Sequence, residues 1–415
     1  MTCPEQWGNA GSLYRGILAS ILLFISCHAT PTDTLSFMSP TELHTITDPA
    51  LAMRSYIQRV ATGPEYSKDI SFGEARDAMQ HILDGTADPV QAGIFLIALR
   101  MKRETLDENG GSLQAIIDAS NIVTAEVDHI ADIADPYDGY TRGLPVSPFL
   151  PAVLAASGLR AVSHGAEAVG PKFGATHRKV LRAASINVDL DPLQTVSRIN
   201  NPDIGWAYID QQHLCPALHD LISLRTRIVK RPVLTTVEVL IGPVRGKVGT
   251  HLMTGYVHKP YPPVYEHLAR LSGFESSVFV RGVEGGVVPS LKQVSKYFEY
   301  QNGGTLAEVE IHPEQAGIHQ DVRAVPLPEL DSSRHSLDGT AAKFDVDQLA
   351  GQAALVGMSA LEGEHGPARD SLIYSGAIML THMGIGKNLN DSAGIVRTAI
   401  DSGKALKHFL GNRRN

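Results

Sequence analysis

The sequence has little cysteine, no excess of positive charge and no apolar run long enough to span a membrane. Its three cysteines, Cys3, Cys27 and Cys215, form no CxxC pair and have no metal-ligand spacing, which argues against a disulfide framework and a zinc site. The net charge of −8 and the isoelectric point near 6.1 argue against a chain-wide attraction to nucleic acid or anionic lipid. These absences predict a cytoplasmic protein with no membrane partner.

The length and composition predict a globular protein of two or three domains. The chain has 415 residues, of which 43% are hydrophobic and 19% charged. Residues 12–29 resemble a short signal sequence, with the apolar run 16–26 at their centre. Because the globular pattern begins only near residue 45, the other interpretation is that residues 1–44 form an N-terminal extension. The sequence leaves the true start of the mature chain open.

The pattern of residues 45–125 predicts a small, all-helical domain. Ser71 and Glu74 form a capping box at the start of a helix over 71–85. Asp88 and Pro89 open a second helix over 88–103, and a third follows over 106–120. We expect this domain to form the dimer interface and to be joined by helices from about 192–228.

Residues 126–415 alternate between β-branched runs and amphipathic stretches, a pattern typical of a sheet with helical crossovers. Strands are expected over 130–133, 159–165, 249–257, 276–285 and 306–313, and helices over 149–157, 177–185 and 261–273. The apolar segment 370–384 predicts a helix buried between layers, and 320–342 predicts a loop. The expected fold class is therefore α/β: a small helical N-terminal domain plus a larger α/β domain whose central, mostly parallel sheet is flanked by helices.

Five segments of the chain, taken together, indicate a family: "ILDGTADPVQAGIFLIALRMKRET", "VSHG", "VFVRGVEGG", "HPEQAGI" and "RTAIDSGKALKHFL". In this order and at these separations the chain resembles the anthranilate phosphoribosyltransferase-like proteins of glycosyltransferase family 3 over residues 45–412. The resemblance implies a substrate cleft between the two domains and a homodimer. It also implies Mg²⁺ as a cofactor beside a phosphorylated small molecule.

The motifs that carry the chemistry of that family differ in this chain. Active members have a Gly-Thr-Gly-Gly-Asp loop around pyrophosphate, where this sequence reads "DPYDG" at 135–139. Side chains at these positions keep the backbone amides from a phosphate, and the two added carboxylates repel it. The family's Lys-His-Gly-Asn motif reads "SHGA" at 163–166 of this chain. The family also has a pair of acidic residues that binds the metal, and Val287 and Val288 stand at or near those positions here. Glu284 is therefore the remaining candidate Mg²⁺ ligand. The chain resembles the active members less than it resembles a divergent branch of the same family, in which some members bind nucleic acid and lack the synthetic activity.

Three stretches supply candidate ligand-binding residues, and each has a structural alternative. The stretch 224–247 is basic and is either an anion site or a solvated face; Arg225 matches the arginine that holds the aromatic acid in active members of the family. The stretch 164–181 is either an anion-binding turn or a structural one. The tyrosines of 137–142 either stack on a ring or shield the domain junction. The candidates in these stretches are Tyr137, Arg142, His164, Gly165, Lys172, Thr176, Arg225, Lys230 and Arg231, and Ser147, shortly after 137–142, is a further candidate. No catalytic residue is assigned.

Two functions remain open. The first is a phosphoribosyltransferase-like protein that binds a phosphorylated ligand in the interdomain cleft and could transfer a pentosyl or phosphoribosyl group, although anthranilate activity is not expected. The alternative is a non-catalytic protein that binds nucleotides or single-stranded nucleic acid. The altered motifs favour the alternative, and the net charge of −8 favours the first.

Overall fold

The computed structural model describes residues 48–63, 65–329 and 344–413. These residues belong to one compact unit, Ile46–Asn415. The signal-like segment at 12–29 and the larger part of the expected loop at 320–342 lie outside the described residues.

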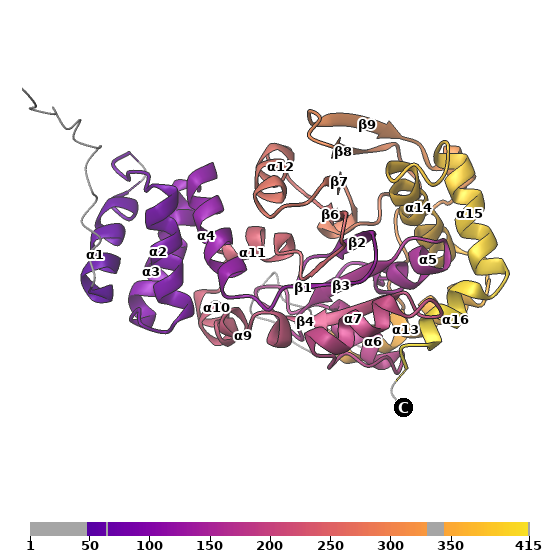
Figure 1. Cartoon of the computed structure of the whole chain (residues 1–415), viewed down its shortest axis with the longest axis horizontal. Coiled ribbons are helices and arrows are strands. Elements are labelled where there is room, and N and C mark those ends of the chain that lie inside the picture. The colour runs from indigo at the N-terminus through magenta and orange to yellow at the C-terminus, as the bar shows by residue number, and fades with distance from the viewer. Residues whose placement is uncertain (1–47, 64, 330–343, 414–415) are drawn as a thin grey trace, which may run out of the picture. The chain divides into compact units, whose positions relative to one another are not determined.

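The N-terminal helices form as the caps predict. In α2, Ser71 and Glu74 make the reciprocal capping box, and in α3 the Asp88 carboxylate accepts hydrogen bonds from the first-turn amides. Figure 1 shows the four helices gathered in one bundle. They are α1 (Pro49–Val60), α2 (Phe72–Leu83), α3 (Pro89–Lys102) and α4 (Leu106–Asp118).

A sheet of seven strands forms the centre of the α/β part, in the order β4-β3-β2-β6-β7-β8-β9. The first five strands in this order are parallel, and β8 and β9 are antiparallel to their neighbours. Their bounds are β2 (His129–Ala134), β3 (Ala161–Gly165), β4 (Trp206–Asp210), β6 (Gly249–Gly255), β7 (Ser276–Val280), β8 (Ser295–Gln301) and β9 (Ala307–Ile311). The short strands β1 (Val123–Thr124) and β5 (Val244–Arg245) pair separately and in parallel.

The remaining helices connect the strands or follow the sheet. The connecting helices are α5 (Leu150–Ala156), α6 (His177–Ala183), α7 (Pro192–Asn200), α8 (Gln211–Leu214), α9 (Pro216–Asp220), α10 (Ile222–Ile228), α11 (Leu234–Val237) and α12 (Tyr261–Leu271). The C-terminal helices are α13 (Val346–Leu361), α14 (Pro367–His382), α15 (Leu389–Asp401) and α16 (Lys404–Leu410). Short 3-10 helices are η1 (Ser147–Phe149), η2 (Glu238–Leu240), η3 (Val283–Gly285) and η4 (Pro313–Ala316).

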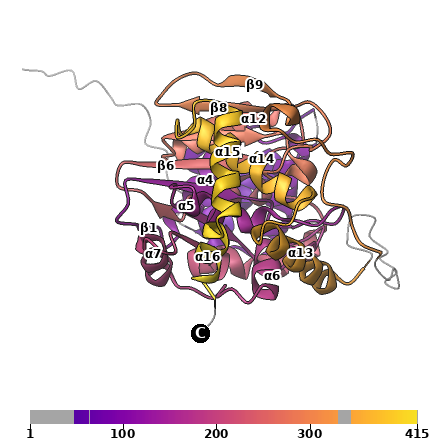
Figure 2. The same ribbon diagram turned by 90° about the vertical axis from the view of Figure 1, so that its right-hand side faces the viewer.

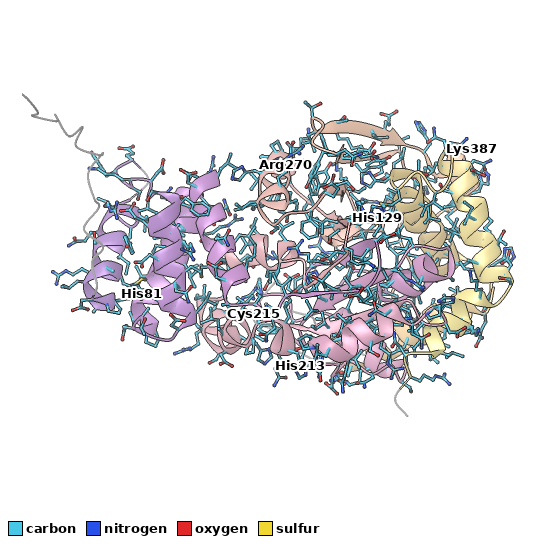
Figure 3. The ribbon with its side chains drawn as sticks, viewed as in Figure 1. His81, His129, His213, Cys215, Arg270 and Lys387 are labelled. Carbon is cyan, nitrogen blue, oxygen red and sulfur yellow. The ribbon has the colours of Figure 1, made fainter. Side chains whose placement is uncertain are left out.

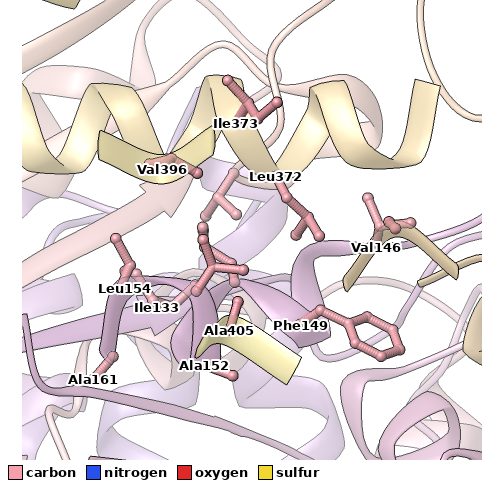
Figure 4. Packing of buried hydrophobic residues seen from close by; sticks show 14 of the residues in the cluster. Ile133, Val146, Phe149, Ala152, Leu154, Ala161, Leu372, Ile373, Val396 and Ala405 are labelled. Carbon is pink, nitrogen blue, oxygen red and sulfur yellow. The ribbon is translucent and has the colours of Figure 1, made fainter. Parts of the chain in front are cut away.

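The parallel strands of the sheet are buried on both faces, as expected for parallel strands between helices, whereas β8 and β9 are partly exposed. In β2, Ala131 and Ile133 pack into one hydrophobic cluster, whereas Ile130 and Ala134 pack into the other. This alternation follows from the two-residue period of a strand. Figure 4 shows the first cluster, with Ile133 among residues from α5, α14 and α15.

The apolar segment 370–384 is confirmed as a buried helix. Most of α14 is buried on all sides, and it contacts α5, α13 and α15. Figure 2 shows the C-terminal helices in front of α5. Among the described residues no helix is both long and apolar enough to cross a membrane.

Two strands of the seven-stranded sheet were missed by the sequence pattern, as were the two-residue strands β1 and β5. The first is β4, which lies within the range 192–228 that was expected to be helical, and which pairs with β3 at the edge of the sheet. It is as fully buried as β6 and β7, but it has a single β-branched residue, Ile209, and so lacks the β-branched pattern that marks those two strands. The second is β8, which alternates only weakly. The helices α8, α9 and α10 do follow β4, and α10 contacts α3 of the bundle.

Candidate functional site

A cavity of about 210 Å³ lies where the helical bundle meets the carboxyl ends of β2, β6 and β7. In open α/β sheets this edge is the usual location of ligand sites. The helices α3, α11, α12 and η2 contribute Arg100, Thr235, Thr236, Val239, Tyr261 and Tyr265. The loops and strand ends contribute Pro136, Asp138, Lys172, Arg231, Pro232, Thr254, Gly255, Tyr256, Val257, His258, Glu284 and Gly285.

The loop at 135–142 contains "DPYDG" in place of the family's glycine-rich motif and is called the altered loop below. Asp138 of this loop binds two of the predicted anion-binding cations. Its buried carboxylate accepts hydrogen bonds of 2.9 and 2.5 Å from Nε and Nη2 of Arg231. The Lys172 ammonium lies 3.5 Å from the same carboxylate. It also donates a 2.6 Å hydrogen bond to the carbonyl oxygen of Gly139. Both cations therefore face an anion that belongs to the chain itself.

Glu284 supplies a second internal carboxylate at the same place. It accepts a 2.7 Å hydrogen bond from the backbone amide of Arg142 and a 3.1 Å bond from that of Thr141. Lys172 lies 3.4 Å away. Glu284 has a φ of 53°, a conformation unfavourable for a residue with a Cβ, which persists only where the surroundings hold it. Its contacts with the altered loop are the interactions that hold it.

Asp135 is the buried anchor of the altered loop. Its carboxylate accepts hydrogen bonds from the hydroxyls of Tyr140 and Ser147, and from the Val287 amide at 2.9 Å. His177 Nε2 lies 3.0 Å from it. Burial by itself would raise the pKa of Asp135, but these partners, His177 first, outweigh burial and hold that pKa below its usual range. Val287, which stands near the expected acidic pair, thus contributes a backbone amide to this anchor.

The packing of the two loops depends on Gly286. A Cβ at this position would lie only 1.6 Å from the Tyr140 hydroxyl oxygen. The residue after Glu284 and Gly285 therefore has to be a glycine for Tyr140 to reach Asp135. The loop at 135–142 and the loop at 282–288 form one interlocked structure.

Tyr137 and His164 do not line the cavity, although Pro136 and Asp138 on either side of Tyr137 do. The Tyr137 hydroxyl contacts Nδ1 of His164, and Nε2 of the same ring lies 2.9 Å from Oδ1 of Asp132 without hydrogen-bond geometry. All three side chains are buried. Burial, followed by the charges of Glu238 and Asp132, raises the pKa of the Tyr137 hydroxyl well above its usual value. Tyr137 is therefore a neutral, packed residue in this structure.

Arg225 also faces an internal carboxylate. Its guanidinium makes a two-pronged ion pair with Glu238, with distances of 2.5 and 2.8 Å, and both side chains are about 99% buried. Such a fork-to-fork pair neutralises the charge of the guanidinium without a ligand, although its buried Nε has no hydrogen-bond partner among the described residues. Gln211 donates a further hydrogen bond of 3.3 Å to Glu238.

The other predicted residues have local roles or face solvent. Thr176 caps α6 by accepting a hydrogen bond from the Lys179 amide. Gly165 is buried at the end of β3. Arg142 and Lys230 are exposed, and their side chains form no ion pair within the residues that the structure describes. Each lies next to a residue that binds Glu284 or Asp138.

The sequence interpretation missed Arg100 as a site residue. Arg100 donates a 2.9 Å hydrogen bond to the Tyr261 hydroxyl and lies 3.9 Å from the Glu104 carboxylate. It therefore has weaker anionic contacts than Lys172 or Arg231. Tyr256 and Tyr265 line the same cavity. The position of Arg100 near the end of an amphipathic helix gave no sign of this role.

The donor atoms present do not fit a magnesium site. Glu284 is engaged by two backbone amides and by Lys172, and Asp138 is engaged by Arg231. In the described part of the chain no cluster of three or more His, Cys, Asp or Glu side chains could hold a metal ion. Magnesium requires several oxygen ligands in near-octahedral geometry, which these carboxylates do not offer.

Curated relatives match most of the chain. The anthranilate phosphoribosyltransferase of Rhodopseudomonas palustris is 28% identical over 353 residues, which cover 85% of this chain and 95% of the relative. That of Acetivibrio thermocellus is 26% identical over 341 residues, covering 82% and 91%.

Solved structures share the fold. The anthranilate phosphoribosyltransferase of Thermus thermophilus matches with a TM-score of 0.65 and 18% identity, covering 87% of this chain and 98% of that one. The Saccharomyces cerevisiae enzyme, solved in complex with PRPP and Mg, matches with a TM-score of 0.66 and 17% identity, covering 86% and 96%.

Two family profiles match in succession. The glycosyl transferase family helical bundle domain matches residues 54–120, and the glycosyl transferase family a/b domain matches residues 141–406. The second match spans more than half of the chain. The helical bundle, the mostly parallel sheet and these matches agree, and the chain therefore belongs to this glycosyl transferase family and has an anthranilate phosphoribosyltransferase-like fold.

Proposed function

We propose that this protein binds a phosphorylated small molecule in the cavity between the helical bundle and the sheet, and that it does not transfer a phosphoribosyl group to anthranilate. The observation that carries the proposal is the pairing of Lys172 and Arg231 with Asp138 and Glu284. These four side chains form what is called the floor of the cavity below. Because two cations face two carboxylates, the floor has no net positive charge with which to bind a pyrophosphate.

The carboxylates cancel the attraction that free cations would give a pyrophosphate. At an effective dielectric constant of 20, the attraction of one unit charge 4 Å away is about 4 kcal/mol, and each carboxylate offsets one such attraction. A pyrophosphate on this floor would meet both Asp138 and Glu284. It would have to displace them, and Glu284 is also bound by the amides of Thr141 and Arg142.

A ligand with one phosphate has a better position at the wall and rim of the cavity. Arg100 lines the wall, and its nearest carboxylate is 3.9 Å away. Arg142 and Lys230 are exposed beside lining residues. The aromatic side chains of Tyr256 and Tyr261 offer a surface against which a ring can pack.

The relatives support the class of ligand. The Saccharomyces cerevisiae enzyme of the same fold was solved in complex with PRPP and Mg. We carry over the phosphorylated ligand but not the metal, because the carboxylates of this cavity are already engaged. Transfer of a pentosyl group to another acceptor stays a prediction. A cytoplasmic location stays a prediction as well.

Calorimetric titration with ribose 5-phosphate, with and without MgCl₂, tests this function. We expect binding that does not require magnesium and that weakens at least tenfold in Arg100→Gln. Arg76→Gln is the matched control, because Arg76 pairs with Asp118 on the bundle surface. Equal affinities in wild type and Arg100→Gln would refute the proposed position. Tight binding of single-stranded oligonucleotides, with a log–log salt slope of about −0.7 per phosphate contact, would instead favour the nucleic-acid alternative.

A further inference from the structure

Five polar side chains form an unbroken series at the edge of the sheet opposite the cavity. His382 Nδ1 lies 2.6 Å from the Glu299 carboxylate. Ser276 Oγ lies 2.7 Å from His382 Nε2 and 2.7 Å from His251 Nδ1. His251 Nε2 lies 3.0 Å from Nδ1 of His129, which is labelled in Figure 3.

The series joins four strands and one helix. His129 and Ser276 are the first residues of β2 and β7, and His251 is the third residue of β6. Glu299 belongs to the antiparallel strand β8, and His382 is the last residue of α14. The C-terminal end of α14 is thereby attached to the amino ends of the parallel strands. Gln301 strengthens this attachment with a 2.8 Å hydrogen bond to the His382 carbonyl.

The contacts define one arrangement of protons with every histidine neutral. The Glu299 carboxylate can only accept, so His382 donates from Nδ1 and accepts at Nε2 from the Ser276 hydroxyl. The Ser276 oxygen then accepts from His251 Nδ1. His251 in turn accepts at Nε2 from His129 Nδ1. Each donor meets one acceptor, and only the far nitrogen of His129 remains for solvent.

Burial makes added charge costly inside the series. His251, Ser276 and His382 are each about 5% exposed, whereas His129 is exposed and Glu299 is partly so. The order Glu299, His382 and Ser276 matches that of a hydrolase triad. Ser276 is only 4% exposed, however, and its oxygen already contacts two histidines, so the series acts on the fold rather than on a ligand.

Among the described residues, the charged groups around the series do not offset the charge of a proton added to His251. Glu299 is the carboxylate in direct contact, and it already pairs with His382. Asp128 and Glu275 neighbour His129 and Ser276 in sequence but are exposed, and Lys387 is an exposed cation beyond the end of α14. A proton added to His251 would therefore have no carboxylate in contact to offset its charge among the described residues.

We propose that Glu299, His382, Ser276, His251 and His129 form a pH-sensitive clamp, which holds the C-terminal end of α14 against the sheet at neutral pH and releases it on acidification. The direction follows from linkage. Burial, followed by the charges of His129 and His382, lowers the pKa of His251 from 6.5 to about 4. A released His251 would titrate near 6.5, so the clamped state is fully stable above that pH and loses stability as the pH falls toward 4.

The clamp is connected to the cavity loops through α14. Ser375 of this helix donates a 3.2 Å hydrogen bond to the Val287 carbonyl, and the Val287 amide binds Asp135. The proposal itself requires only local release and does not depend on the ligand of the cavity.

Hydrogen exchange of the full chain at pH 7.5 and pH 5.0, corrected for intrinsic rates, tests the clamp. In the wild type we expect peptides covering residues 376–383 to lose at least tenfold in protection at pH 5.0, because opening takes up about one proton. His251→Asn should lack this dependence on pH. His319→Gln, which changes an exposed histidine outside the series, should keep it. Ser276→Ala should reduce protection at both pH values.

Equal dependence on pH in wild type and His251→Asn would overturn the proposal, as would unchanged protection of α14 in Ser276→Ala. If His251→Asn does not fold, the wild type alone decides through the pH dependence of its unfolding free energy. A slope that corresponds to no proton uptake between pH 6.5 and pH 4 would contradict the clamp.

Discussion

The Asp138 carboxylate binds the Arg231 guanidinium through two hydrogen bonds, of 2.9 and 2.5 Å, at the floor of the cavity. Replacing Asp138 with asparagine removes the negative charge that pairs with Arg231, and it leaves Lys172 with Glu284 as its one carboxylate partner among the described residues. We expect inorganic pyrophosphate to bind Asp138→Asn at least tenfold more tightly than it binds the wild type. Calorimetry measures this difference.

Asp203→Asn is the matched control for that substitution. Asp203 pairs with Lys407 at 2.8 Å on the surface, so its loss removes an equal charge far from the cavity lining. The same gain of affinity in both variants would mean that net charge, rather than the pair with Arg231, controls binding.

The buried pair of Arg225 and Glu238 is expected to stabilise the fold. Arg225→Ala leaves Glu238 buried without its cation, and such a change costs about 3–5 kcal/mol of unfolding free energy. The double change Arg225→Met with Glu238→Leu should cost clearly less. Urea denaturation measures both. A loss below about 1 kcal/mol for Arg225→Ala would show that Arg225 is not required by the fold and would favour a role in ligand binding.

Asp135 should make the fold sensitive to strong acid. Its partners hold its pKa below the usual 3.8, so its contribution is present above that pH and is lost as the pH falls through the lower, folded value. At pH 6 we expect Asp135→Asn to be about 1–3 kcal/mol less stable than the wild type. Urea denaturation at pH 6, 4 and 3 should show this gap closing below about pH 4. A constant gap would contradict the assigned ionisation.

We expect a homodimer formed through the helical bundle. Val90, Ile94 and Met101 of α3 are 68%, 45% and 75% exposed, and together they present an apolar face. Light scattering of the wild type should give twice the chain mass of 44.6 kDa. Ile94→Lys combined with Met101→Lys should give the monomer mass. Leu355→Lys, on α13, is the control and should leave the mass unchanged; a monomeric wild type would refute this interface.

The sequence predicted the elements whose signals are local. Ser71 with Glu74 and Asp88 with Pro89 defined the starts of α2 and α3, because caps act within one turn. Short β-branched and apolar runs located β2, β3, β6, β7 and β9. The strand β4, with Ile209 as its one β-branched residue, was missed.

The cavity could be located from the sequence only in part. The basic residues Lys172, Arg225 and Arg231 were evident, but their carboxylate partners lie 112, 13 and 93 positions away. Such pairings depend on the tertiary fold and leave no local pattern. The series through His251 and Ser276 was missed for the same reason, because its members come from separate strands and a helix.

The most direct test of the central claim is a turnover assay of the wild type with anthranilate, phosphoribosyl pyrophosphate and MgCl₂. The pairing of Lys172 and Arg231 with Asp138 and Glu284 predicts no product, and therefore a rate far below the scale of about 1 s⁻¹ that is common for enzymes. Magnesium-dependent turnover at that scale would contradict the account, because it would show that these carboxylates leave the floor of the cavity open to pyrophosphate.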